Sequence, residues 1–165
     1  MDPYQLGGAV VWLSRSREKQ AGDTALSYAM TGKLYFSKSG YLLLSVPNAL
    51  GRGVFDAMTE PGIELPTSGI TGQYNAHISV MRPEEVAQAG GADKITERGH
   101  ELRYTLGPLR SCEPHGWNDV SRCWMLAVQS PALEGLRKSY GLTPKPFGNQ
   151  FDFHITVAIR KKNVM

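Results

Sequence analysis

Residues Phe151–Arg160, FDFHITVAIR, decide how this chain is organised. Side chains alternate between the two faces of a β-strand, so His154 and Thr156 would share one face. Ile155 and Val157 would then share the other face and point into a core. The stretch therefore predicts a half-buried strand with one polar face. Such a strand is common, and this one copy by itself says little about function.

A second copy of the pattern stands in Asn75–Met81, NAHISVM. Here His77 and Ser79 would share one face, and Ile78 and Val80 the other. The two histidines are 77 residues apart (positions 77 and 154), close to half of the 165 residues. A spacing of half the chain suggests an internal duplication.

The residues upstream of each histidine repeat as well. YLLLSV at 41–46 is followed by PNAL and a helix-like stretch, and CWMLAV at 123–128 is followed by SPAL and another. Each half therefore reads strand, helix, loop, and then a strand that carries H-x-[S/T]-x. A duplication of this kind predicts a cleft with one histidine–hydroxyl pair on each wall.

With these two tetrads, the sequence resembles the 2H phosphoesterase superfamily, which includes RNA 2′,5′-ligase-like proteins and cyclic phosphodiesterases. Both His77-Ile78-Ser79-Val80 and the tetrad that starts at His154 match the signature H-x-[S/T]-hydrophobic, the family's HxT motif. The resemblance runs from about Lys33 to Lys161. It implies an α+β fold with two pseudo-symmetric lobes around a central cleft, each lobe an antiparallel sheet with flanking helices. Residues 33–165 would form this single bilobal domain, and residues 1–32 an N-terminal extension or helical cap.

Two histidines with pKa values near neutrality can remove a proton from a nucleophile and deliver one to a leaving oxygen. His77 and His154 are therefore the expected acid–base pair, and Ser79 and Thr156 the expected donors to the non-bridging phosphate oxygens. Asp152 precedes His154 by two residues and favours the protonated imidazole there, which would make His154 the acid and His77 the base, unless its carboxylate turns to solvent or to a lysine.

The resemblance implies a metal-independent phosphoesterase that cleaves or opens a 2′,3′-cyclic, 2′-5′ or 3′-5′ phosphodiester. Its substrate would be an RNA end, an oligonucleotide or a cyclic nucleotide. No cofactor is expected, and no metal site is predicted, because the chain has no ligands at metal spacing. The alternative is a non-catalytic module that binds RNA ends or nucleotides in the same cleft.

Several other residues are candidate substrate contacts. Tyr74 precedes the first tetrad and could stack on a base, or could be a core aromatic. Arg160 shares strand parity with His154 and could reach phosphate, as could Arg82 and Lys145, although basic side chains of this kind are often only solvated. His100 and His115 lie outside the repeat and are not expected to be catalytic, but the turn that holds His115 could line the substrate mouth.

Composition restricts the class of protein. A hydrophobic fraction of 41% with 20% charged residues is typical of one globular domain, and the net charge of +3 favours a nucleotide or short RNA over duplex nucleic acid. No targeting or membrane segment is evident, so we expect a cytoplasmic monomer that does not bind membranes. Cys112 and Cys123 fall on neighbouring expected strands, and we expect free thiols, with a disulfide as the alternative.

The remaining elements follow from local signals. Asn48 is the expected N-cap of a helix that runs to Met58, and Ser130-Pro131 should begin a second helix that Gly141 ends. Thr24–Met30 is compatible with a helix. The other expected elements are a hairpin over 34–46, a helix over 83–89, a strand over 101–112 with a kink at Gly107-Pro108, and loops over 59–73, 113–120 and 143–150 that would select the substrate.

Overall fold

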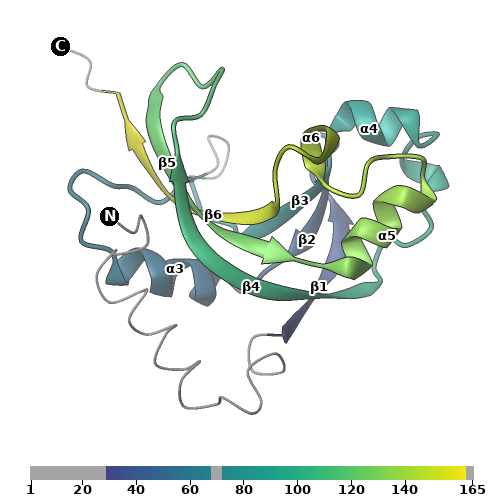
Figure 1. Ribbon diagram of the computed structural model, residues 1–165, viewed down its shortest axis with the longest axis horizontal. Helices are drawn as coiled ribbons and strands as arrows, with labels where there is room; N and C mark the ends of the chain where they lie inside the picture. Colours follow the sequence, from purple (N-terminus) through teal and green to yellow (C-terminus); the bar gives the residue numbers. More distant parts are fainter. Residues whose placement is uncertain (1–28, 68–71, 163–165) are drawn as a thin grey trace.

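A computed structural model describes residues 29–67 and 72–162 of the chain, which form strands and short helices (Figure 1). The elements in chain order are β1 (Ala29–Phe36), β2 (Leu42–Ser45), α3 (Asn48–Ala57), β3 (His77–Met81), α4 (Pro83–Gln88), a 3₁₀ turn (Ala92–Lys94), β4 (Glu101–Cys112), β5 (Val120–Gln129), α5 (Pro131–Ser139), α6 (Pro146–Asn149) and β6 (Phe153–Lys161). No helix of this described part is long and apolar enough to cross a membrane.

The strands form one antiparallel sheet in the order β1-β2-β3-β6-β5-β4, which closes where β1 pairs with β4. The expected α+β class with antiparallel strands is confirmed. Each half of the chain contributes two strands, a helix and a third strand in the same order, and the second half adds the short α6 before its third strand. Because the halves join both at β3–β6 and at β1–β4, their strands make a continuous sheet. The symmetry of two lobes remains a prediction.

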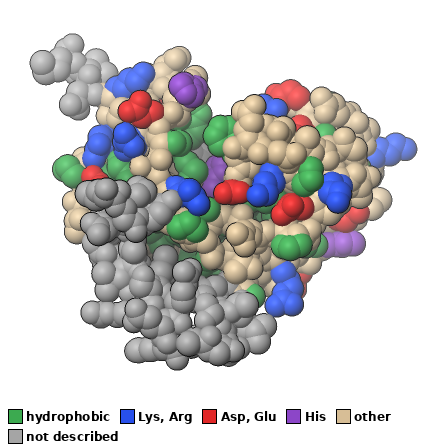
Figure 2. Space-filling model, in the orientation of Figure 1, with side chains coloured by type: hydrophobic (Ala, Val, Ile, Leu, Met, Phe, Trp, Pro, Cys, Tyr) green, Lys and Arg blue, Asp and Glu red, His purple; other side chains and the backbone are tan. Residues whose placement is uncertain are grey.

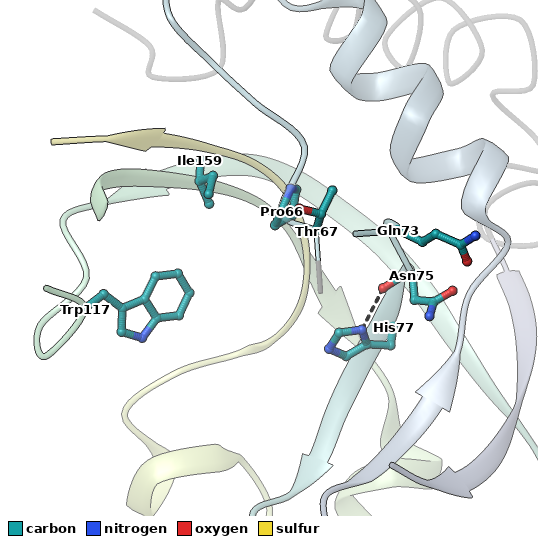
Figure 3. A pocket seen from close by; sticks show the side chains of 7 residues that line it. All are labelled: Pro66, Thr67, Gln73, Asn75, His77, Trp117 and Ile159. Atoms are coloured by element: carbon teal, nitrogen blue, oxygen red, sulfur yellow. Dashed lines mark hydrogen bonds between the residues drawn. The ribbon is translucent and has the colours of Figure 1, made fainter. Parts of the chain in front are cut away.

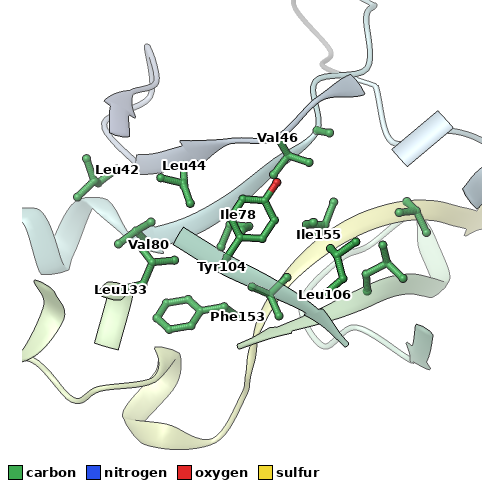
Figure 4. Close-up of a cluster of buried hydrophobic side chains, with 14 of the residues drawn as sticks. Leu42, Leu44, Val46, Ile78, Val80, Tyr104, Leu106, Leu133, Phe153 and Ile155 are labelled. Carbon is green, nitrogen blue, oxygen red and sulfur yellow. The ribbon is translucent and has the colours of Figure 1, made fainter. Parts of the chain in front are cut away.

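One face of this sheet packs into a single apolar core (Figure 4). Three apolar residues in or next to β2 and three in β5 are all buried; they are Leu42, Leu44, Val46, Trp124, Leu126 and Val128. Leu133 of α5 and Val54 of α3 reach the same core. In Figure 1, α4, α5 and α6 gather at one end of the sheet and α3 lies at the other. The opposite face of the central strands is left for the site.

Of the two residues expected at helix N-termini, one is an N-cap and the other is not. Ser130 is the N-cap of α5, as expected, because its hydroxyl accepts a hydrogen bond from Leu133 N at 3.1 Å. Asn48 is not a cap: it is the first residue of α3, and its Oδ1 accepts from Ala76 N at 2.8 Å. The Asn48 side chain therefore connects α3 to the residue that precedes the first histidine strand.

The start of β1 corrects another expectation. Ala29 and Met30 pair with Thr105 and Tyr104 of β4, so this end of the expected Thr24–Met30 helix is strand. Residues 24–28 lie outside the described residues. The boundary expected between residues 32 and 33 falls inside β1, and the described part of the extension therefore belongs to the sheet. The kink in β4 is confirmed by a register shift between Leu106 and Leu109.

Candidate active site

The two histidine strands are neighbours. β3 and β6 run antiparallel with Ile78 opposite Ile155, and both isoleucines are fully buried. Carrying this register one residue in each direction places His77 opposite Thr156 and Ser79 opposite His154. Since side chains alternate, these four residues lie together on the face away from the core. We call His77, Ser79, His154 and Thr156 the quartet.

Both tetrads end in a β-bulge at the same position. In β3 the pairing with β2 skips Val80, and in β6 the pairing with β5 skips Val157. The five residues from each histidine onward share one burial pattern, in which the last two positions are both buried. A bulge reverses the face on which later residues point. β3 and β6 therefore carry the same local irregularity at the last residue of each tetrad.

The two imidazoles are held in the same way. His77 Nδ1 lies 2.8 Å from the backbone oxygen of Asn75, and His154 Nδ1 lies 3.1 Å from that of Asp152. A carbonyl oxygen only accepts hydrogen bonds, so Nδ1 must carry the proton in both rings. The Nε2 atom of each ring is then the one that accepts or donates a proton. Both side chains are half-buried, which leaves them accessible to a ligand.

The bulge at Val157 corrects the expectation for Arg160. Beyond it the parity of β6 changes, so Ile159 rather than Arg160 returns to the quartet face. The Arg160 guanidinium instead lies 5.1 Å from the ring centre of buried Trp124 and pairs with Glu60 at 3.3 Å. Arg160 therefore anchors the loop that follows α3 and does not point at the quartet.

The other two basic candidates lie beyond the Ser79 end of the quartet. Arg82 directly follows β3, and its guanidinium lies over the ring of Phe147 at 4.6 Å from the ring centre. Lys145 Nζ is 3.2 Å from a carboxylate oxygen of Asp152. The lysine alternative for Asp152 is thus the one observed, and its carboxylate gives no reason to assign His154 as the acid.

Tyr74 is a core residue and not a stacking platform. It is only 3% exposed, and its hydroxyl donates to the backbone oxygen of Thr156 at 3.0 Å. Burial raises the pKa of Tyr74 to about 12, although the charge of Arg52 opposes the shift. A Cβ atom at Gly51 would lie 1.9 Å from the tyrosine hydroxyl, so the approach of α3 needs glycine there. Tyr74 therefore supports β6 from the core side.

A hollow adjoins the quartet on the His77 side (Figure 3). It is lined by Pro66, Thr67, Gln73, Asn75, His77, Trp117 and Ile159. His154, Ser79 and Thr156 do not line it, so it is a neighbour of the quartet and not its centre. The space-filling view shows a hollow between two masses with a histidine at its floor (Figure 2). Trp117, on the hairpin between β4 and β5, was not among the expected contacts, and only the turn around His115 hinted at it.

The remaining expected features lie outside the quartet. His100 and His115 are exposed in loops. Cys112 and Cys123 are opposite each other on β4 and β5 as free thiols, with their sulfurs 3.2 Å apart. Within residues 29–67 and 72–162, no group of three or more histidine, cysteine or acidic side chains could hold a metal ion. Independence of metal remains a prediction.

Comparison with known protein families agrees with the geometry. The family model described as 2H-SAK, Swiss Army Knife, 2H phosphoesterase domain, matches residues 55–165. The match covers about two thirds of the chain and includes both tetrads and the hairpin that carries Trp117. No curated protein and no solved structure matches the chain.

Proposed function

Because the chain belongs to the 2H phosphoesterase family, we propose that it hydrolyses or opens a phosphodiester by acid–base catalysis with His77 and His154. The substrate would be a 2′,3′-cyclic, 2′-5′ or 3′-5′ phosphodiester of an RNA end, an oligonucleotide or a cyclic nucleotide. A phosphoesterase-type function follows from the family alone. The substrate and the mechanism are our proposal.

The matched hydrogen bonds of the two histidines support it most directly. Each Nδ1 donates to a backbone oxygen two residues upstream, which fixes both rings and leaves both Nε2 atoms for proton transfer. In the extended register the two histidines are diagonal neighbours, which on antiparallel strands lie about 7–8 Å apart. That separation leaves room for one phosphate group between them.

The reaction needs one neutral and one protonated histidine. The neutral ring takes a proton through Nε2 from water or from a ribose hydroxyl, whose oxygen then forms the new bond to phosphorus. The protonated ring gives its Nε2 proton to the ester oxygen as the old P–O bond breaks. The Ser79 and Thr156 hydroxyls donate to the non-bridging oxygens, which gain negative charge in the transition state. Exchange with solvent resets both rings.

The test is turnover by the purified protein in EDTA. Nucleoside 2′,3′-cyclic phosphates, 2′-5′ oligoadenylates and cyclic dinucleotides would be offered, with products identified by chromatography and phosphorus NMR. His77→Ala and His154→Ala should each lower the rate at least ~10²-fold, the usual contribution of a positioned acid or base. The rate should pass through a maximum with pH, because both protonation states are needed.

His100→Ala is the matched control, because this exposed loop histidine lies outside the quartet and should keep full activity. Unchanged turnover by His77→Ala would end the catalytic proposal. Activity lost in EDTA and restored by zinc or manganese would contradict metal independence. Binding of these nucleotides without any turnover would instead support the alternative, a nucleotide-binding module.

A further inference from the structure

The hollow beside His77 has walls of a distinctive chemistry. Pro66, Ile159 and the indole of Trp117 supply apolar surface, while Gln73 and Asn75 supply amide groups. Among the residues that the structure describes, no lysine, arginine, aspartate or glutamate lines it. A second hollow beside β6 differs, because Glu64, Arg160, Lys161 and Lys162 line it. The first hollow is therefore suited to an uncharged group that has apolar faces and polar edges.

The size of this hollow and its position beside His77 further restrict the kind of ligand that it could bind. The cavity measures about 340 Å³, at the lower end of the range for small-molecule sites. In Figure 3 the imidazole of His77 and the indole of Trp117 face the same open space, with Ile159 and Pro66 along one side. A group held there would be joined closely to the phosphate between the two histidines. A nucleobase, one ribose away from its phosphate, meets this description.

Trp117 is much more exposed to solvent than the other tryptophan among the described residues. It is 47% exposed, whereas Trp124 is 2% exposed. Its hairpin is nevertheless anchored at the base: Arg122 donates to Ser111 at 3.1 Å and to Glu113 at 3.3 Å, and Lys162 N donates to Asp119 O at 2.8 Å. A large apolar ring held over a hollow and left open to solvent is what a base-stacking residue requires.

We propose that Trp117 stacks on the nucleobase attached to the ribose on the His77 side of the scissile phosphate. This inference rests on the proposed function, since it takes the quartet as the phosphate site. It restricts the substrate to phosphodiesters that carry a base, and so excludes glycerol, inositol and bare sugar phosphodiesters as preferred substrates. Trp117 is a specificity-determining residue and takes no part in proton transfer.

The test compares ligands with and without a base by calorimetry. Adenosine 3′-monophosphate and 1-O-methylribose 3-phosphate, which lacks the base, would be titrated into the wild-type protein, Trp117→Ala and Trp117→Phe. Stacking on one base contributes affinity that corresponds to about 5-fold to 100-fold. The wild type should prefer the adenosine ligand by such a factor. Trp117→Ala should lose that preference with little change for the base-free ligand, and Trp117→Phe should keep most of it.

Tyr41→Ala is the matched control, because Tyr41 is also an exposed aromatic residue, at 36%. It precedes Leu42, which pairs with Met81, so it lies at the opposite end of β3 from His77. The Tyr41→Ala variant should bind both ligands as the wild type does. Equal affinity of the wild type for the two ligands, no binding of the adenosine ligand, or an unchanged preference in Trp117→Ala would each overturn the proposal. Failure of the proposed function is distinct, because it would show as nucleotide binding through Trp117 with no turnover of any diester.

Discussion

At the scale of single residues, the proposed chemistry rests on main-chain hydrogen bonds to two imidazoles and on two hydroxyl groups. In the register of β3 and β6, each hydroxyl lies opposite the histidine of the other tetrad. Ser79 is therefore placed beside His154, and Thr156 beside His77. In the proposed mechanism, each pair that would bind phosphate is therefore built from both halves of the chain. Neither half alone would provide a complete set.

The hydroxyl groups can be tested without disturbing the strands. Thr156→Val replaces the hydroxyl by a methyl group and keeps the β-branched shape, and Ser79→Ala removes the serine hydroxyl. Each should lower kcat by no more than roughly 10²–10³-fold, the contribution of one oxyanion donor, with KM little changed. Steady-state kinetics would measure both constants. Thr105→Val on β4 is the control, and an equal loss of kcat there would show that the effect is structural.

At the scale of elements, the sequence predicted most of the fold because its signals are local. Alternating apolar residues, Ser130-Pro131 and the two H-x-[S/T]-x tetrads each indicate an element within a few residues. The bulges at Val80 and Val157 could not be predicted this way, because a bulge is defined by pairing with another strand. Strict alternation therefore placed Arg160 on the quartet face and missed Ile159 there.

The site contacts that could not be predicted from the sequence also depend on residues that are far apart in the chain. Trp117 stands in a turn whose direction depends on the long β4–β5 hairpin, and local sequence beyond the turn around His115 does not indicate that it lines the same hollow as His77. Tyr74 was an open choice between stacking and core. Its contact with Gly51 and its hydrogen bond to Thr156 join residues far apart in the chain, and these long-range contacts decided for the core.

A buried arginine supports the first bulge. Arg137 of α5 is fully buried, and one of its nitrogens donates to the backbone oxygen of Val80 at 2.7 Å. It also donates to both carboxylate oxygens of Glu85 on α4, at 3.0 and 2.6 Å. Arg137 thus provides a hydrogen-bond donor for the Val80 carbonyl at the bulge. Its hydrogen bonds also link α4 and α5 to β3.

Removing this arginine should be costly. Arg137→Met deprives the Glu85 carboxylate of its buried partner, and breaking a buried pair in this way typically costs about 3–5 kcal/mol. Arg122→Met is the control, because its pair with Glu113 is partly exposed and such pairs contribute about 0–1 kcal/mol. Urea denaturation followed by circular dichroism would give both free energies of unfolding. Similar values for the two variants would contradict the structural role of Arg137.

The cysteine pair gives a separate prediction for β4 and β5. Burial, with a further contribution from Cys112, raises the pKa of Cys123 to about 12, so its thiol stays protonated at neutral pH. Because the thiolate is the reactive form, the Cys123 thiol should resist oxidation in a glutathione buffer, and the two cysteines should stay unlinked there. A strong oxidant such as copper-phenanthroline should nevertheless join them within one chain, since the sulfurs are 3.2 Å apart. Mass spectrometry after alkylation would measure this, and disulfide-linked dimers would contradict it.

At the scale of the whole molecule, the sheet closes through contacts that no local pattern indicates. The pairing of β1 with β4 joins residues about seventy positions apart, and it draws Ala29–Gly32 into the sheet. The pairing of β3 with β6 joins the two tetrads into one site. The family signature indicated that the two motifs meet, but only the topology shows which residue of one lies opposite which residue of the other.

Stability at low pH should depend on the same buried network. Burial alone would raise the pKa of Glu85, but hydrogen bonds and charge from Arg137 and Arg82 lower it below its ordinary value of 4.5. A carboxyl group whose pKa is lower in the folded state stabilises the fold above its unfolded pKa. That contribution is lost as the pH falls through the folded value. Unfolding temperatures should therefore fall as the pH is lowered below about 4.5.

The contribution of Glu85 can be separated from that of other acids by substitution. Glu85→Gln cannot titrate, so its unfolding temperature should start lower at neutral pH, where Arg137 lacks its charged partner, and should then fall less steeply below pH 4.5. Glu84→Gln, which changes an exposed neighbour, should keep the wild-type slope. Thermal unfolding from pH 7 to pH 3 would compare the three proteins. Equal slopes for Glu85→Gln and the wild type would show that acid unfolding begins elsewhere, and the link between the helices and the quartet strand would then not limit stability.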